Sequence, residues 1–202
     1  MSSHSKSNSK QRKKGFSRGE KIIGLVILVV AIWAVYSFTQ PPSPSTTTTS
    51  TGTTATGVPV APDFTLPVVT QDGLTGQRIS LSSFRGKVVL LEFMEPWCSV
   101  CQDMAPMLDR LYAQYEAQNV VFLAVAGPYN SATADDAAKF IRDYGTAWTF
   151  VYDSSGTTFT TYGVSATPTF FLIAKNGSID TRYEGTNATF EILAAGLTRL
   201  NS

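Results

Sequence analysis

Two short apolar runs constrain the fold of this chain more than any other feature. Residues 88–94 have the sequence VVLLEFM and residues 120–126 have VVFLAVA, and turn-forming or polar residues flank both runs. Such near-continuous apolar runs are typical of strands that are buried on both faces in a parallel sheet. Between them, apolar side chains recur at helical spacing from Met104 to Tyr115. The three segments predict a strand-helix-strand unit.

Shorter segments extend this unit into a complete α/β domain. We predict a hairpin from residues 64–69 and 78–81, a helix at 134–144, strands at 149–152 and 169–174, a hairpin strand at 179–183 and a closing helix at 188–200. This order predicts one central sheet that is covered by helices on both faces.

The N-terminal region differs in character from this domain. Residues 1–21 contain seven Lys or Arg and one Glu, and residues 22–38 contain no charge. The uncharged run is at the lower end of the length that a helix needs to cross a bilayer. It exceeds the usual apolar core of a cleavable signal peptide, and no Ala-x-Ala site follows it. We therefore predict a retained transmembrane anchor at 22–38 and a cytoplasmic basic tail at 1–21.

Residues 39–60 connect the predicted anchor to the predicted domain. They are rich in Ser, Thr and Pro and carry no charge, so they have little apolar surface to bury. We predict a linker at 39–60 and a folded domain at 61–202. The chain is thus expected to be a single-pass protein of the cell membrane, with its N-terminus cytoplasmic and its domain outside the cytoplasm.

Composition excludes several classes of partner and site. Outside residues 1–21 the chain has nine Lys or Arg and fourteen Asp or Glu, a net charge of −5, which argues against a nucleic-acid-binding face. With two Cys and one His, a four-ligand zinc site would depend almost wholly on carboxylates. We therefore expect no nucleic acid, no metal and no cofactor other than a redox-active pair of cysteines.

Both cysteines lie where the first strand leads into the first predicted helix, in the segment PWCSVC. Free N–H groups and the helix dipole at that position favour a thiolate, so we expect a lowered pKa for Cys98. Cys101 follows one turn later on the same face and can attack a mixed disulfide formed at Cys98. A purely structural disulfide would close too short a loop to stabilise the fold much. We predict that Cys98 is the nucleophile and Cys101 the resolving thiol.

Several further positions carry a resemblance to the thioredoxin superfamily. Besides Trp97-Cys98-x-x-Cys101, they are Glu92, Phe93, Pro106 and the Thr167-Pro168 pair. The resemblance covers about residues 61–202 and implies a thioredoxin-like fold, a central mixed sheet with helices on both faces. In that superfamily the proline equivalent to Pro168 is cis and faces the cysteine pair. The resemblance thus implies that Trp97, Thr167 and Pro168 lie at the substrate-binding side, with Thr167 offering backbone groups to an extended substrate.

Within the superfamily the chain is similar to the exported, membrane-anchored TlpA/ResA-type proteins, which are redoxin or AhpC-TSA-like. The N-terminal hairpin and an inserted helix-strand unit at about 132–152 carry this similarity. It implies thiol-disulfide exchange with exported proteins, a membrane electron-transfer partner and, commonly, reduction of apocytochrome c. Two positions depart from the pattern, because Glu92 replaces a usual Asn and Met104 replaces a frequent Glu.

Two glutamates near the cysteines have different predicted environments. Glu92 interrupts an apolar strand, so we expect it to be buried with a raised pKa and able to accept or donate a proton. In thioredoxin-like proteins the acid at this position serves the second cysteine, here Cys101. The alternative for Glu92 is a solvated charge at a strand edge. For Glu95, beyond the end of the strand, we predict a solvated loop charge.

Two other functions are compatible with a fold of this kind. A peroxiredoxin-like peroxide reductase needs a Pro-x-x-x-Thr/Ser-x-x-Cys pattern, but Glu95 stands where Thr or Ser is required. A copper-binding assembly module needs a Cys-x-x-x-Cys pair and a distant His, but His4 lies in the N-terminal tail. The sequence therefore favours a protein-disulfide oxidoreductase and leaves the direction of electron flow open.

Overall fold

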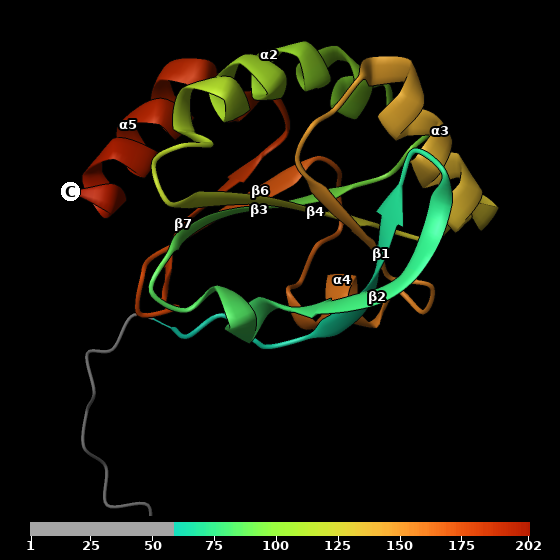
Figure 1. Cartoon of the computed structure of the whole chain (residues 1–202), viewed down its shortest axis with the longest axis horizontal. Coiled ribbons are helices and arrows are strands. Elements are labelled where there is room, and N and C mark those ends of the chain that lie inside the picture. Colours follow the sequence, from blue (N-terminus) through green and yellow to red (C-terminus); the bar gives the residue numbers. More distant parts are fainter. Residues whose placement is uncertain (1–58) are drawn as a thin grey trace, which may run out of the picture. The chain divides into compact units, whose positions relative to one another are not determined.

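The computed structural model describes residues 59–202, so the predicted tail, the predicted anchor and nearly all of the predicted linker lie outside the described residues. Within residues 59–202, no helix combines the length and the apolar character that a bilayer crossing requires. These residues form one mixed sheet of seven strands in the order β2-β1-β5-β4-β3-β6-β7. Helices lie on both of its faces (Figure 1). The α/β thioredoxin-like fold predicted from the sequence is confirmed.

The elements follow the predicted order. The strands are β1 (Thr65–Thr70), β2 (Gly73–Ser80), β3 (Val88–Met94), β4 (Val120–Ala126), β5 (Thr149–Tyr152), β6 (Thr169–Ile173) and β7 (Ile179–Glu184), and the helices are α2 (Ser99–Tyr115), α3 (Ala134–Tyr144), α4 (Thr157–Thr161) and α5 (Phe190–Asn201). The strands β3, β4 and β5 and the helix α3 have the bounds that the sequence predicts. The short helix α4 was not predicted, because TTFTT is rich in β-branched residues and shorter than two helical turns.

The pairing of the strands places β3 at the centre of the sheet. It runs parallel to β4 on one side and antiparallel to β6 on the other. The predicted hairpins are present as β1 with β2 and β6 with β7, both antiparallel. Because β3 has neighbours on both sides, its carboxyl end, where the cysteine segment begins, is held by the rest of the sheet.

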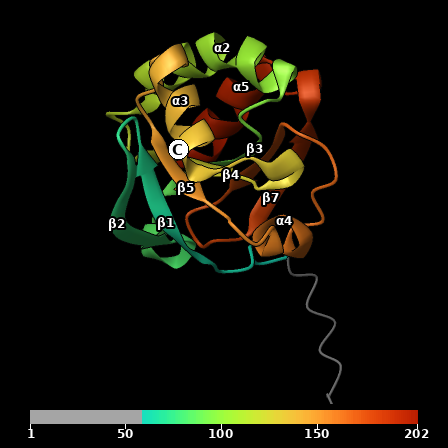
Figure 2. The same ribbon diagram turned by 90° about the vertical axis from the view of Figure 1, so that its right-hand side faces the viewer.

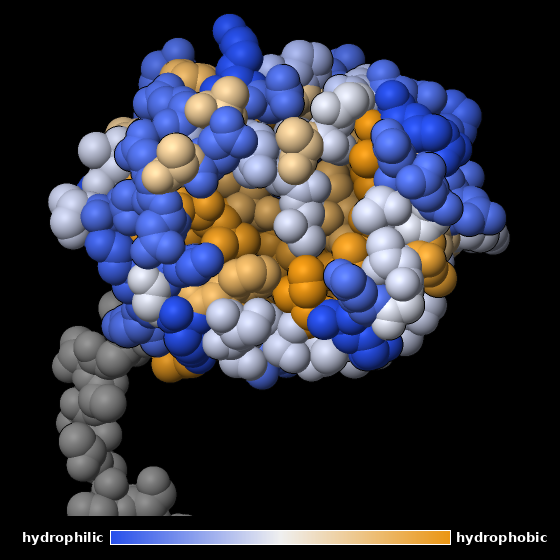
Figure 3. Space-filling view, viewed as in Figure 1, coloured by the Kyte–Doolittle hydropathy of each residue, from blue (hydrophilic) through white to orange (hydrophobic). Residues whose placement is uncertain are grey.

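Side chains of β3 alternate between two separate cores, as expected for a strand. Leu90 and Met94 belong to the cluster beneath α2, α3 and α5. Leu91 and Phe93 belong to the cluster on the opposite face, together with Phe159 of α4. Figures 1 and 2 show these two sides, with α2, α3 and α5 above the sheet and α4 below it. In Figure 3, hydrophobic residues are visible in a hollow between the helical layer and the lower part of the domain.

Local sequence signals fix the ends of the helices that surround the site. Thr133 and Asp136 form a capping box at the start of α3, and Gly145 ends this helix with φ 63°. Thr189 accepts a hydrogen bond from the Ile192 amide and so begins α5 two residues later than the sequence predicts.

Candidate active site

The two cysteines lie at the junction of β3 and α2, as predicted. Cys98 is the N-cap residue of α2, and its Sγ accepts a hydrogen bond from the Cys101 amide at 3.2 Å. The two residues are joined by a disulfide, with their Cα atoms 5.3 Å apart. Cys98 is 6% exposed and Cys101 is 1% exposed. The first sulfur is therefore the more accessible one, and the helix terminus points at it.

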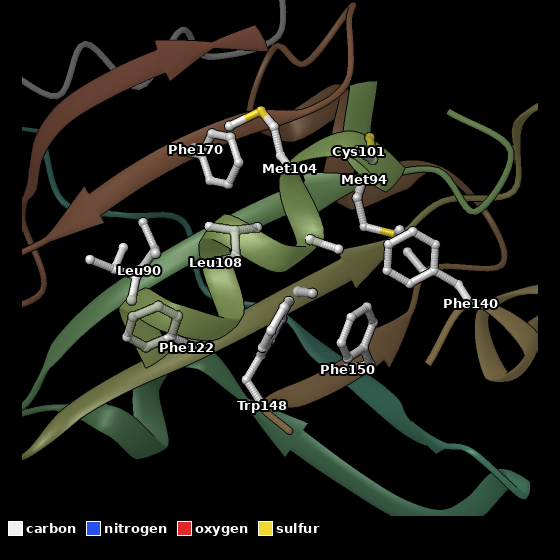
Figure 4. Packing of buried hydrophobic residues seen from close by; sticks show 14 of the residues in the cluster. Leu90, Met94, Cys101, Met104, Leu108, Phe122, Phe140, Trp148, Phe150 and Phe170 are labelled. Carbon is white, nitrogen blue, oxygen red and sulfur yellow. The ribbon is translucent and has the colours of Figure 1, made fainter. Parts of the chain in front are cut away.

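Cys101 faces the larger of the two cores. It belongs to the cluster that contains Met94 of β3 and Met104 of α2, and Figure 4 shows Cys101 above Met94 in this view. Such an apolar environment has little capacity to stabilise an ionised sulfur by solvation. A thiolate at Cys101 would thus need a nearby group that can take its proton.

The segment before β6 lies against Cys98. The peptide bond between Thr167 and Pro168 is cis, as the resemblance implies. The Thr167 carbonyl oxygen lies 3.4 Å from the Cys98 Sγ, although the two residues are 69 positions apart. The structure therefore brings together Cys98, Thr167 and Pro168, which the sequence analysis grouped at one site.

Trp97 borders the site on its exposed side. Its side chain is 50% exposed, and its indole Nε1 donates a hydrogen bond to the Tyr129 carbonyl at 3.0 Å. This bond fixes the ring against the loop that follows β4. Trp97 thus presents a rigid aromatic surface beside Cys98, in agreement with the predicted position.

Glu92 is buried within the sheet, as predicted. It is 5% exposed, and it pairs with Ala124 of β4 and Phe170 of β6. Its position in the alternation of β3 is that of Leu90 and Met94, so its side chain faces α2, the helix that carries Cys101. Desolvation by burial raises the pKa of Glu92 to about 8. The alternative of a solvated charge at a strand edge is thereby excluded.

Glu95 contradicts its prediction, because it is buried rather than solvated. Only 1% of it is exposed. Its Oε1 accepts a hydrogen bond from the Tyr129 amide at 3.3 Å, whereas its Oε2 is buried and has no hydrogen-bond partner. Desolvation by burial raises the pKa of Glu95 to about 7, and the Tyr129 amide and the Trp97 indole lower it only in part. The loop after β4 folds over the carboxyl, and this long-range contact accounts for the wrong prediction.

One sequence signal for this burial was available. Gly127 follows β4, and a Cβ atom at this position would lie 2.1 Å from Glu95 Oε1 and 2.6 Å from Phe159 Cζ. A glycine next to the end of a buried strand therefore marks a place where another side chain approaches the backbone. Its partner, however, cannot be identified from the glycine alone.

Two surface pockets flank Trp97. One, of about 450 Å³, is lined on one side by residues of α3 such as Asp136 and Phe140. The other, of about 410 Å³, lies between Trp97 and Thr167 and contains Glu95. Among residues 59–202, no group of three or more His, Cys, Asp or Glu side chains is arranged to hold a metal ion.

This geometry can support thiol-disulfide exchange. It combines a sulfur at a helix N-terminus, a second sulfur one turn further on, and a buried carboxyl on the face of the sheet that the second sulfur contacts. The cis-proline segment at Thr167 and the half-exposed side chain of Trp97 border the first sulfur. The arrangement thus provides both a nucleophile and a surface on which an extended polypeptide can lie.

Comparison with known proteins agrees with this chemistry. The AhpC/TSA family matches the chain over residues 59–182. The thiol-disulfide oxidoreductase ResA of Bacillus thuringiensis subsp. konkukian is 35% identical over 126 residues, which cover 62% of this chain and 68% of that protein.

Solved structures show the same similarity at the level of the fold. A putative thiol:disulfide interchange protein DsbE from Chlorobium tepidum aligns with a TM-score of 0.63 and 32% identity, over 71% of this chain and 96% of that one. The structure of MTB dsbF aligns with a TM-score of 0.60 and 26% identity, over 71% of this chain and 99% of that one.

Proposed function

The chain belongs to the AhpC/TSA family and is a thiol-disulfide oxidoreductase of the ResA/TlpA type in the thioredoxin superfamily, and from this premise we propose how its residues divide the reaction. The observation that supports the division best is the position of Cys98, which caps α2 and is more exposed than Cys101. Cys98 is the attacking sulfur and Cys101 the resolving one.

The exchange proceeds in two steps when the chain acts as a reductant. The Cys98 thiolate attacks one sulfur of a substrate disulfide, a mixed disulfide forms, and the other substrate sulfur leaves as a thiolate. The Cys101 thiolate then attacks the Cys98 sulfur, which releases the second substrate sulfur and closes the Cys98–Cys101 disulfide. Free backbone N–H groups at the start of α2 stabilise the negative charge on Cys98 in the first step.

Glu92 serves the second step. Cys101 must lose its proton as it attacks, and it lies in an apolar environment on the face of the sheet toward which Glu92 points. A carboxylate whose pKa is raised to about 8 by desolvation is a suitable proton acceptor near neutral pH. Glu92 thus takes the Cys101 proton, directly or through a water molecule.

Substrate polypeptides dock across the cis-proline segment. The Thr167 carbonyl is adjacent to the Cys98 Sγ, and the backbone there can pair with an extended chain as an additional strand would. Trp97 covers the opposite side of the docked segment. Trp97, Thr167 and Pro168 are therefore the substrate-binding residues of this proposal, and the Cys98–Cys101 pair is the only redox group that it requires.

The domain acts outside the cytoplasm, tethered to the cell membrane by residues 22–38. Support comes from the sequence, in which a basic tail precedes an uncharged apolar run. Its substrates are exported protein thiols and disulfides, apocytochrome c cysteines among them, and a membrane electron-transfer partner restores its redox state. Protease added to spheroplasts should cut within residues 39–60 and release the domain. Protection of the domain until lysis would contradict this topology.

One set of assays tests the reaction class. The reduced full-length chain should reduce insulin disulfides and a peptide disulfide that contains an apocytochrome-type Cys-x-x-Cys segment, and Cys98→Ser should abolish both activities. The same preparation should neither consume hydrogen peroxide catalytically nor bind copper stoichiometrically. Peroxide turnover without insulin reduction would contradict the proposed function.

A further inference from the structure

The carboxyl of Glu95 has an unusual environment that the exchange mechanism does not use. It follows β3 on the face opposite to Glu92, where a Cβ atom on Gly127 would meet both Glu95 Oε1 and the Phe159 ring, and where Glu95 and Phe159 line one pocket. Although only 1% of the residue is exposed, its Oε2 accepts no hydrogen bond. A buried carboxylate oxygen without a partner is unfavourable, and in a functional site it marks the place of a missing donor.

The pocket beside Glu95 has room for that donor. It measures about 410 Å³, and its nine lining residues include Glu95, Trp97, Tyr129, Phe159, Ser165 and Thr167. Three of these side chains are aromatic. Glu95 is the only charged residue among the nine, so nothing in the lining neutralises its carboxylate. The pocket is thus an aromatic cleft with one acidic group at its wall.

The pocket adjoins the exchanging sulfur. Thr167, whose carbonyl lies 3.4 Å from the Cys98 Sγ, forms one wall, and Trp97, the neighbour of Cys98, forms another. The Cys98 amide also donates to the Glu95 carbonyl at 3.0 Å, so the two residues belong to one turn. A polypeptide that brings a cysteine to Cys98 along Thr167 therefore places a neighbouring side chain at the mouth of this pocket.

We propose that the pocket is a substrate subsite for a basic side chain, lysine or arginine, next to the substrate cysteine, and that Glu95 recognises its charge. This proposal rests on the proposed function. The buried carboxylate supplies a charge-assisted hydrogen bond through Oε2. Trp97, Tyr129 and Phe159 offer apolar surface to the methylene stem and aromatic faces to the cation.

Charge favours this occupant over the others that could enter. An acidic substrate residue would meet the Glu95 carboxylate without any compensating cation in the lining. A neutral apolar residue would fill the volume and leave Oε2 without a donor. A basic side chain satisfies both requirements, and it also stabilises the ionised form of a carboxyl whose pKa burial raises to about 7.

Matched peptide disulfides test the subsite with the full-length chain. Three peptides of otherwise identical sequence carry lysine, norleucine or glutamate on both sides of one cysteine, which is blocked as a disulfide with 2-mercaptoethanol. The reduced chain converts each into free peptide and 2-mercaptoethanol while forming its own disulfide. At pH 8 we expect the second-order rate constant of this single-turnover exchange to be at least about tenfold higher for the lysine peptide than for norleucine, and lowest for glutamate.

Variants identify the residue responsible. Glu95→Gln should abolish the lysine preference, whereas Glu92→Gln, which removes the other buried carboxyl, should slow exchange and retain the preference. Ser165→Lys places a tethered cation at an exposed position of the pocket, so it should lower the preference without changing Glu95. Ser165→Gln, similar in length but neutral, should retain it.

The outcomes separate the two proposals. Equal exchange of the lysine and norleucine peptides by the unmodified chain would overturn the subsite alone, as would a lysine preference that survives in Glu95→Gln. Loss of the preference in Ser165→Gln as well as in Ser165→Lys would overturn the role of charge. Exchange with none of the peptides would overturn the proposed function, and the subsite with it.

Discussion

Glu92 and Glu95 are three residues apart and differ in almost everything except their burial. The even-numbered side chains of β3 face α2 and the odd-numbered ones face α4, so the two carboxyls lie toward opposite faces of the sheet. Desolvation is the sole cause of the raised pKa of Glu92, whereas Glu95 receives an amide N–H and lines a pocket. In the roles proposed above, the carboxyl inside the core transfers a proton and the one at the pocket wall binds a substrate side chain.

The two sulfurs have different roles in the proposed reaction, and removing each of them should have the largest effect. Cys101→Ser should trap substrates as mixed disulfides at Cys98, because the resolving attack is lost. Cys98→Ser should trap essentially none, because the remaining sulfur is buried in the core. Non-reducing electrophoresis of the full-length variants after reaction with insulin measures both. Equal trapping by the two variants would reverse or remove the assigned order.

Removing each carboxyl in turn shows which of them affects the rate at which the mixed disulfide is resolved. Glu92→Gln keeps the shape and removes the base, so resolution of the mixed disulfide at pH 7 should slow by at least about tenfold, a conservative bound against the roughly 10²–10⁴-fold that general base catalysis typically contributes. The rate at which iodoacetamide alkylates Cys98 should keep its pH midpoint. Quenched-flow measurement of the mixed disulfide provides the test.

Glu95→Gln is the matched control for that measurement. It should leave resolution of a norleucine peptide within about threefold of the unmodified rate, since the removed oxygen lies across the sheet from Cys101. If Glu95→Gln slows resolution as much as Glu92→Gln does, the two carboxyls share one function and the contrast between them fails.

The pH dependence of the free energy of unfolding should report the burial of each carboxyl. Both folded-state pKa values, about 8 and about 7, exceed the usual carboxyl value of 4.5. Between pH 4.5 and these folded-state pKa values, the folded chain therefore binds more protons than the unfolded chain. The free energy of unfolding consequently falls as pH rises through this range. The stabilising contribution of each protonated carboxyl is complete below pH 4.5 and lost above its folded-state pKa.

Each Gln variant should remove the part of this decrease in the free energy of unfolding that its carboxyl causes. At pH 8, Glu92→Gln should raise the free energy of unfolding by a few kcal/mol at most, because each pKa unit corresponds to about 1.4 kcal/mol. Glu95→Gln should give a smaller rise that is complete near pH 7. Urea unfolding of the oxidised chain from pH 4.5 to 9 measures both, and an unchanged pH profile in Glu92→Gln would contradict the burial of its charge.

The smallest effect is expected from Gly127→Ala, which fills the space between the Gly127 backbone and the Glu95 carboxyl. In Gly127→Ala the new Cβ meets Glu95 Oε1 and the Phe159 ring, so the carboxyl must shift within its pocket. We expect a loss of stability of about 1 kcal/mol, at the low end for overpacking, together with a reduced lysine preference. Resolution by Cys101 should not change. Urea unfolding and the peptide assay provide the measurements, and an unaltered peptide preference would show that the position of Glu95 does not matter.

Most of the architecture, and the positions of Cys98 and Glu92, follow from local patterns in the sequence. The apolar runs of β3 and β4 and the amphipathic pattern of α3 were sufficient because strand and helix periodicity is a local property. The same local patterns predicted that Cys98 lies at the start of a helix. They also predicted the burial of Glu92, since a charge inside a strand flanked by apolar residues shares their environment.

The surroundings of the end of β3, by contrast, depend on contacts between segments that are far apart in the chain. The burial of Glu95 depends on Tyr129 and Phe159, which lie 34 and 64 positions further along the chain, and the Cys98 contact with Thr167 spans 69 positions. A residue beyond a strand has no periodic partners that fix its environment, so its exposure depends on how distant loops pack over it. For this reason the carboxyl within the strand was predicted correctly and the one just beyond it was not.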